Sequence, residues 1–333
     1  MPVVFYRALV QSGNTAPVDA LVRALSARRL RSLPIFVHSL KDGEAAALLD
    51  TAFAAAPPAV VLNATGFSVR TGARSDPLAA TECPVLQIVF AGNDEDSWRA
   101  GTRGLGPRDL AMNVALPEID GRILSRAVSF KAPLGRDLET EADLVGYRPV
   151  ADRIAFAADL ARNWVRLRTK PPGERRVALI FANYPNRDGR IGNGVGLDTP
   201  ASAVAILRAL AEAGYRIGEV PENGDALIQR LLAGPTNANP SAPGDESLSF
   251  ADYSAFFATL PLAVQQVVAA RWGPGERDPF FRPGRLDCGR FAIPGFRAGN
   301  VAVLIQPARG YNIDPKSTYH DPALVPPYGY FAA

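Results

Sequence analysis

The chain has 333 residues, 47% of them hydrophobic and 21% charged, with a formal net charge of +3 at pH 7. This length favours two or three domains, and the apolar content is sufficient for a core in each. No stretch approaches the ~20 apolar residues of a membrane-spanning helix, and no lysine-rich run indicates nucleic-acid binding. No signal-like leader opens the chain, so we expect a cytoplasmic protein with neither a membrane nor a nucleic acid as partner.

Residues 1–131 alternate between short apolar runs, typical of buried strands, and segments with helical periodicity. This alternation predicts a first α/β unit, a parallel sheet flanked by helices. The expected strands are Val3–Val10, Leu33–His38, Val60–Leu62 and Val85–Phe90, and the expected helices are Pro17–Arg29 and Glu44–Ala55.

A polar loop follows each expected strand, at the sheet edge where parallel sheets bind ligands. Each loop can belong to a binding site, or can simply cap the next helix. Further on, LPEIDGR puts Glu118 and Asp120 beside Gly121, either as a solvated turn or as carboxylates in a cleft. The loops are Gln11–Thr15, His38–Asp42, Asn63–Arg70 and Ala91–Asp96.

Residues 132–172 are expected to form a linker followed by a helix. The stretch Ala132–Val150 is rich in proline, glycine and charge, whereas Ala151–Arg168 has helical periodicity. The cluster Lys170-Pro171-Pro172-Gly173 ends that helix and is the strongest signal for a domain boundary.

Residues 173–245 predict a second α/β unit, in which the strand Arg176–Ala182 and the helix Ala201–Ala213 flank a long loop. Thr199 is expected to cap this helix, with Pro200 at its first position. A further helix is expected near Gly224–Leu232, and the weakly apolar run Gly234–Glu246 is expected to be mobile.

The long loop of this second unit, Asn183–Ser202 (NYPNRDGRIGNGVGLDTPAS), combines four glycines with charged and amide side chains. Loops of this length are usually functional sites, although a mobile surface loop is the alternative. A nucleotide site is disfavoured, because Leu197 stands where the dinucleotide fingerprint needs its third glycine and the chain has no Gly-Lys pair for a P-loop.

Residues 246–333 are expected to form an incomplete domain with an irregular C-terminal tail. A helical segment, Phe250–Ala270, is interrupted at Pro261, and strands are expected at Phe291–Phe296 and Val301–Ile305. The tail that follows is rich in proline and glycine, and it concentrates polar side chains, namely Gln306, Arg309, Tyr311, Asp314, His320 and Asp321.

Several blocks of sequence, spread in order over nearly the whole chain, carry a family resemblance. They are FVHSLKD (Phe36–Asp42), PVLQIVFAG (Pro84–Gly92), RGLGPRDLAMNVALPEIDGR (Arg103–Arg122), the loop Asn183–Ser202 and QPARGYNIDPKSTYHDP (Gln306–Pro322). On these blocks the chain resembles the large subunit of aerobic cobaltochelatase, in the family that includes the porphyrin-binding subunit of magnesium chelatase.

The resemblance implies a role in ATP-dependent insertion of Co²⁺ into the corrin ring of hydrogenobyrinic acid a,c-diamide during cobalamin biosynthesis. It further implies that cobalt is a substrate ion and that separate AAA+ partner subunits use the ATP. In the family, the matching chain continues into a segment with closely spaced histidines and a glutamate, which is missing here. The chain therefore resembles an internal fragment of a larger subunit, expected to be inactive alone.

Candidate residues follow from the chemistry of such a substrate. Arginines bind rim carboxylates, Co²⁺ suits imidazole and carboxylate ligands, and a base must take up the pyrrole protons, although each arginine can equally be a solvated surface residue. Of the chain's two histidines, His38 is expected to be structural. The candidates are Glu118 and His320 for catalysis, His320 and Asp321 for the metal, and Arg187, Arg190, Asn193, Asp198, Gln306, Arg309 and Tyr311 for substrate binding.

Alternatives remain open at this level. A magnesium chelatase-like, porphyrin-binding subunit and a non-catalytic small-molecule binding module both fit paired α/β units. Tyr328 stands where the resembling family usually has histidine, in Pro-Pro-His-Gly-Tyr, which puts one element of a metal path in doubt. Cys83 and Cys288 lack metal-type spacing and are expected to be buried free thiols.

Overall fold

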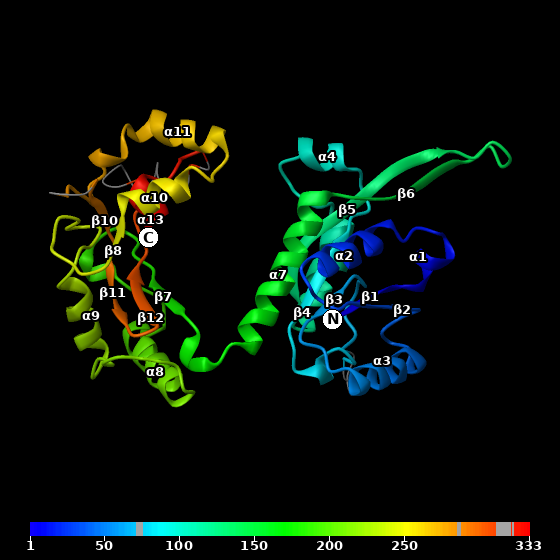
Figure 1. The fold of residues 1–333 in the computed structure, drawn as a ribbon, viewed down its shortest axis with the longest axis horizontal. Helices are drawn as coiled ribbons and strands as arrows, with labels where there is room; N and C mark the ends of the chain where they lie inside the picture. The colour runs from blue at the N-terminus through cyan, green and yellow to red at the C-terminus, as the bar shows by residue number, and fades with distance from the viewer. Residues whose placement is uncertain (71–75, 285–287, 311–320, 322) are drawn as a thin grey trace. The chain divides into compact units, whose positions relative to one another are not determined.

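The computed structural model describes residues 1–70, 76–284, 288–310, 321 and 323–333. The chain divides into two compact units, Met1–Thr169 and Lys170–Ala333 (Figure 1). The division lies at the proline–glycine cluster that ends the long helix α7 (Ala151–Thr169). Both units combine helices with parallel strand pairs, so the predicted α/β class is confirmed.

The first unit is built on a six-stranded sheet of order β2-β1-β3-β4-β5-β6, in which only β6 runs antiparallel to its neighbour. A π-helical turn, Leu110–Ala115, separates its short helices α5 and α6. The strands are β1 (Pro2–Tyr6), β2 (Leu33–Val37), β3 (Val61–Asn63), β4 (Val85–Phe90), β5 (Ile123–Arg136) and β6 (Asp143–Pro149). The other helices are α1 (Arg7–Gln11), α2 (Ala16–Ala27), α3 (Gly43–Ala55), α4 (Glu95–Ala100), α5 (Pro107–Asp109) and α6 (Leu116–Ile119).

Helices cover both faces of this sheet, as they do in parallel sheets generally (Figure 1). Alternate residues of a strand point to opposite faces, so Val3 and Phe5 of β1 join the core with α2 and α7, whereas Val4 joins the core with α3. The central strand β4 is buried at every position. The chain's apolar runs therefore fix the sheet between two helical layers.

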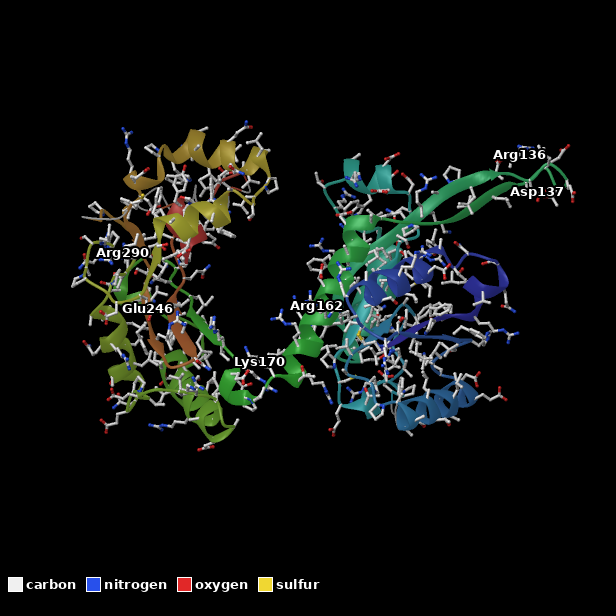
Figure 2. All side chains as sticks on the ribbon, viewed as in Figure 1. Arg136, Asp137, Arg162, Lys170, Glu246 and Arg290 are labelled. Carbon is white, nitrogen blue, oxygen red and sulfur yellow. The ribbon has the colours of Figure 1, made fainter. Side chains whose placement is uncertain are left out.

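Two expectations for the first unit are wrong. The strand expected at Val3–Val10 ends at Tyr6, where the helix α1 begins. The stretch Ala132–Val150, expected to be a linker, instead forms the outer part of the β5–β6 hairpin, which extends away from the body of the sheet (Figure 1). Its tip carries Arg136 and Asp137 (Figure 2), and the Asp137 carboxylate accepts two backbone N–H groups of the turn.

Some of the polar loops at the sheet edge do cap helices. Asp42 accepts the backbone N–H of Glu44 at the start of α3, and Asp94 accepts that of Ser97 at the start of α4. Asn14 instead reaches across to the backbone N–H of Tyr147 in β6, at 2.9 Å. These loops therefore stiffen the carboxyl edge of the sheet.

Among its described residues, the second unit contains two three-stranded sheets. One has the order β11-β12-β7, with β7 and β12 parallel, and the other is the antiparallel sheet β8-β10-β9. The strands are β7 (Val177–Phe181), β8 (Ser247–Ser249), β9 (Phe281–Arg282), β10 (Arg290–Ala292), β11 (Gly295–Ala298) and β12 (Val301–Ile305). The helices are α8 (Thr199–Glu212), α9 (Gly224–Leu232), α10 (Phe250–Phe257), α11 (Leu262–Trp272) and α13 (Tyr328–Ala332).

Each sheet of the second unit has its own core. Helices α8 and α9 pack on the β11-β12-β7 sheet, and an aromatic cluster around Tyr253, Phe291 and Tyr328 joins the other sheet to α10, α11 and α13. The helical segment is interrupted at Pro261, as predicted. Because β12 pairs with β7, the second α/β unit does not end at residue 245 but needs residues from the C-terminal region to complete its sheet.

Two further expectations differ from the structure. The strand expected at Phe291–Phe296 is divided between β10 and β11, which lie in different sheets. The run Gly234–Glu246 is anchored, because Thr236 is buried and Asn237 bonds to neighbouring segments. Within the described ranges, no helix combines the length and apolar character that crossing a bilayer requires.

Candidate functional site

The candidate site of the second unit lies at the carboxyl edge of the parallel pair β7 and β12. The two strands end side by side at Phe181 and Ile305, and the backbone N–H of Gln306 donates to the carbonyl of Phe181 at 2.8 Å. The glycine-rich loop and the tail therefore leave the sheet next to each other. This is the edge at which open α/β sheets bind ligands.

The side chain of Asn237 ties three segments together at this edge. Its Nδ2 donates to Asn183 Oδ1 at 2.7 Å and to the carbonyl of Gln306 at 2.9 Å, while its Oδ1 accepts the backbone N–H of Ala308 at 3.0 Å. Asn183 is buried and donates in turn to the carbonyl of Arg187 at 2.9 Å. One amide thus joins the glycine-rich loop, the 234–242 loop and the tail.

The base of the glycine-rich loop is tightly built. The backbone N–H of Gly192 donates to the carbonyl of Ala182 at 2.7 Å, and Asn183 pairs with Ile191 across the loop. Gly192 has a φ of +70°, and a Cβ there would lie 2.7 Å from the ring of Phe181. Only glycine fits this close approach, so the glycine has a structural reason at the base of the site.

The tip of the loop is exposed, from Asn193 to Asp198, and Val195 is fully exposed. Arg187 and Arg190 are also exposed, and a guanidinium nitrogen of Arg190 lies 3.4 Å from the amide oxygen of Asn193. Such arginines can reach a carboxylate in solvent, where single ion pairs are weak. The tip therefore offers cations without enclosing a ligand by itself.

The cap of α8 is Asp198 rather than Thr199, which is the first residue of the helix, with Pro200 second. An Asp198 carboxylate oxygen accepts the backbone N–H of Ala201 at 3.0 Å. The expectation that Thr199 caps the helix is therefore wrong by one residue. A carboxylate that caps a helix in this way is already engaged in a local bond.

The remaining candidates are dispersed. Gln306 and Arg309 are half-buried, and the Gln306 carbonyl accepts the Asn237 amide, whereas Asp321 is exposed and accepts the backbone N–H of Ala323. Tyr311 and His320 lie outside the described residues. Glu118 belongs to the first unit, where it is exposed on α6. The structure thus brings Gln306 to the base of the glycine-rich loop, with Arg309 directly after the bonded Ala308 in the chain.

Asp120, the neighbour of Glu118, has a structural environment. Its carboxylate accepts the Ser68 hydroxyl at 2.7 Å and the backbone N–H groups of Val69 and Arg70, and it lies 3.4 Å from the guanidinium of Arg122. Burial alone would raise the pKa of Asp120, but these bonds and the positive charge together lower the pKa. The two carboxylates therefore do not form a matched pair.

Other sequence-level expectations have mixed outcomes. Among the described residues, no group of three histidine, cysteine, aspartate or glutamate side chains could hold one metal ion. His38 follows β2 and is exposed rather than packed. Both cysteines are free, as predicted, but Cys83 is only half-buried and Cys288 is exposed.

Asn237 is the residue that sequence reasoning missed. It lies in a run whose low apolar content resembles that of mobile loops, and its partners are distant in the sequence. The only local signal is an amide-rich stretch, Thr236–Asn239, directly after an expected helix. That pattern alone does not indicate which segments the amide joins.

Comparisons with known proteins give a consistent result. The family model described as CobN/Magnesium Chelatase matches residues 1–333. The chain is 56% identical to the aerobic cobaltochelatase subunit CobN of Sinorhizobium sp, over 99% of this chain and 26% of that protein. It is 27% identical to the magnesium-chelatase H subunit of Rhodobacter capsulatus, over 99% of this chain and 28% of that protein.

A solved structure agrees with the sequence comparisons. The structure titled "Catalytic Subunit of Cobaltochelatase from Mycobacterium tuberculosis" superposes with a TM-score of 0.80 at 34% identity, covering 99% of this chain and 28% of that chain. The chain therefore spans about a quarter of the length of the relatives it matches.

Proposed function

The chain belongs to the CobN/magnesium chelatase family, and on that premise we propose that it is part of the corrinoid-binding subunit of an ATP-dependent cobaltochelatase. This enzyme inserts Co²⁺ into hydrogenobyrinic acid a,c-diamide in cytoplasmic cobalamin biosynthesis. The observation that carries the proposal is that identity to a cobaltochelatase subunit, over essentially the whole chain, is about twice that to a magnesium chelatase subunit. The magnesium-type, porphyrin-binding function is the alternative that the experiment below separates.

In this function the edge of β7 and β12 contacts the rim of the macrocycle. Arg309, half-buried beside the Asn237 junction, binds a rim carboxylate, and Arg187 and Arg190 approach others from the exposed loop. Gln306 and Asn193 supply further polar contacts and Tyr311 packs against the ring face, while Asp198 contributes mainly by fixing the start of α8. An anchor of this kind orients a substrate whose chemistry takes place elsewhere.

The metal chemistry needs ligands and a base. Co²⁺ is the substrate ion, His320 and Asp321 are candidate ligands during its delivery, and His320 and Glu118 are candidates for proton uptake. AAA+ partner subunits supply the coupling to ATP hydrolysis. Because the chain matches only about a quarter of its relatives' length, we expect it to bind substrate without completing insertion alone.

The test is an absorbance titration of the purified chain with hydrogenobyrinic acid a,c-diamide and, separately, with protoporphyrin IX. We expect the corrinoid to bind at least about tenfold more tightly than the porphyrin. Arg309→Ala should weaken corrinoid binding by about tenfold, because one charge-assisted contact is lost. Arg290→Ala, which removes an exposed arginine elsewhere in the same unit (Figure 2), is the matched control. Equal affinities for the two macrocycles, or equal effects of the two substitutions, would contradict the proposal.

A further inference from the structure

The first unit contains a cavity that the proposed function does not use. Its strand order places β2 on one side of β1 and β3 on the other, so the chain reverses direction across the sheet at β1. Open α/β sheets bind ligands beyond the carboxyl ends of their strands at such a reversal. Here a cavity of about 530 Å³ lies at that place, lined by Tyr6 at the end of β1, Ala64 after β3 and Phe90 at the end of β4.

One wall of the cavity is a polar framework. The nearly buried carboxylate of Asp109 accepts the backbone N–H of Gly92 at 2.7 Å and the side-chain amide of Asn113 at 3.1 Å. At Gly66, a Cβ would lie 2.8 Å from Asn113 Oδ1, so the loop after β3 also presses closely against this wall. The loops after two neighbouring strands are thereby fixed around the cavity.

The same wall includes the π-helical turn Leu110–Ala115, which carries Met112 and Asn113 into the cavity lining. A π-helical turn is rare in proteins and is found frequently at functional sites. The carbonyl of Met112 accepts the backbone N–H of Phe67 at 2.7 Å. This irregular turn is therefore tied to the sheet edge and forms part of its binding surface.

The lining favours an anion. Arg108 and Lys131 are both exposed at the cavity, and neither side chain has an ion pair or hydrogen bond among the residues that the structure describes. The carboxylate of Asp109 is already occupied by two internal N–H donors. Two available cations beside one engaged carboxylate attract a carboxylate or phosphate group.

The rest of the lining favours an apolar body. The rings of Phe90 and Tyr147 lie 5.8 Å apart, and Leu9 and Met112 complete the apolar surface. Polar groups that converge beside an apolar surface, in a volume of this size, are typical of sites for small organic molecules. We propose that this cavity binds a small organic anion, with its carboxylate or phosphate at Arg108 and Lys131 and a flat apolar body against Phe90, Met112 and Tyr147.

The anionic group can come from a corrinoid carboxylate or from a separate phosphate-bearing metabolite. Two probes distinguish these sources: hydrogenobyrinic acid a,c-diamide, and flavin mononucleotide with uncharged riboflavin as its partner compound. We expect at least one anionic probe to bind, and riboflavin to bind about tenfold more weakly than flavin mononucleotide if the phosphate is recognised. Calorimetric titration of the full chain measures all three.

Substitutions locate the binding. Arg108→Ala and Lys131→Ala should each weaken the bound anion by about tenfold, whereas Arg162→Ala and Lys170→Ala, which remove cations outside the cavity (Figure 2), should change affinity by less than about twofold. If only the corrinoid is weakened, the cavity takes a corrinoid carboxylate; if only the mononucleotide is weakened, it takes a separate phosphate ligand. If neither anion depends on Arg108 or Lys131, the proposal is overturned. Its failure is distinct from that of the proposed function, which depends on Arg309.

Discussion

Two tyrosines of the same aromatic cluster differ in how their hydroxyl groups are satisfied. Tyr253 is 2% exposed, its ring centroid lies 4.6 Å from that of Phe291, and its hydroxyl has no hydrogen-bond partner among the described residues. Burial, with smaller contributions from Tyr328 and Asp278, raises the pKa of Tyr253. The hydroxyl of Tyr328 instead donates to the carbonyl of Gly273 at 2.7 Å. Tyr328 is therefore part of the packed core.

The same substitution should have opposite effects at these two positions. Tyr253→Phe removes an unsatisfied buried hydroxyl, so the free energy of unfolding should stay equal or rise by up to about 1 kcal/mol. Tyr328→Phe removes a buried hydrogen bond and should lower that free energy by about 1 kcal/mol. Urea titration, with hydrogen exchange of α10 as the local readout, measures both. A loss of similar size in both variants would contradict the assignment.

The carboxylates Glu118 and Asp120, two residues apart, should also behave differently. The side chain of Arg122 is 1% exposed and lies 3.4 Å from Asp120 and 3.7 Å from Asp76. Asp120→Asn removes one partner of this buried ion pair and should lower the free energy of unfolding by about 3 kcal/mol at neutral pH. Glu118→Gln, on an exposed side chain, should change it by less than about 0.5 kcal/mol.

The pH dependence provides a second readout for Asp120. Its pKa is lowered in the folded state, so its stabilising contribution is present above the ordinary pKa of an aspartate and is lost as the pH falls through the folded value. Asp76 contributes in the opposite direction, because burial raises its pKa. Asp120→Asn should therefore flatten the loss of stability on acidification, measured by urea titration at several pH values. An unchanged acid slope would show that Asp120 does not provide it.

At the scale of elements, periodicity predicted what local pattern determines. The helices α2, α3, α7, α8 and α9 were all predicted within a few residues, because each buries one periodic face. The outer hairpin of β5 and β6 was missed because its strands are largely exposed, and exposed strands have the composition of linkers. The early end of β1 was missed because the apolar residues of α1 continue the strand pattern.

The candidate site shows the same limit. Glycines and a helix start made the loop after β7 recognisable, since close approach and capping depend on neighbouring residues. The junction at Asn237 and the cavity beside the π-helical turn could not be recognised, because their partners are brought together only by the order of strands. Which polar side chains meet at a sheet edge is a property of topology, and one sequence contains no direct signal of it.

At the scale of the whole chain, each unit contains its own buried clusters. Leu86 is fully buried in the first unit among residues of β1, α2 and α7, and Leu207 is fully buried in the second unit among residues of α9 and β12. A domain with its own core unfolds as one cooperative unit. We therefore expect the chain to have two regions of hydrogen-exchange protection, one for each unit.

Leu86→Ala and Leu207→Ala test this expectation as a matched pair. Each leaves a cavity in a well-packed core and should cost about 2–5 kcal/mol of local stability. Leu86→Ala should speed exchange throughout α2, α7 and β1 while leaving α8 and β12 protected, and Leu207→Ala should do the reverse. Exchange measured by mass spectrometry on the full chain resolves these segments. If either substitution deprotected both units equally, the chain would unfold as a single cooperative body, and the proposed corrinoid binding at one unit would then have to stabilise both.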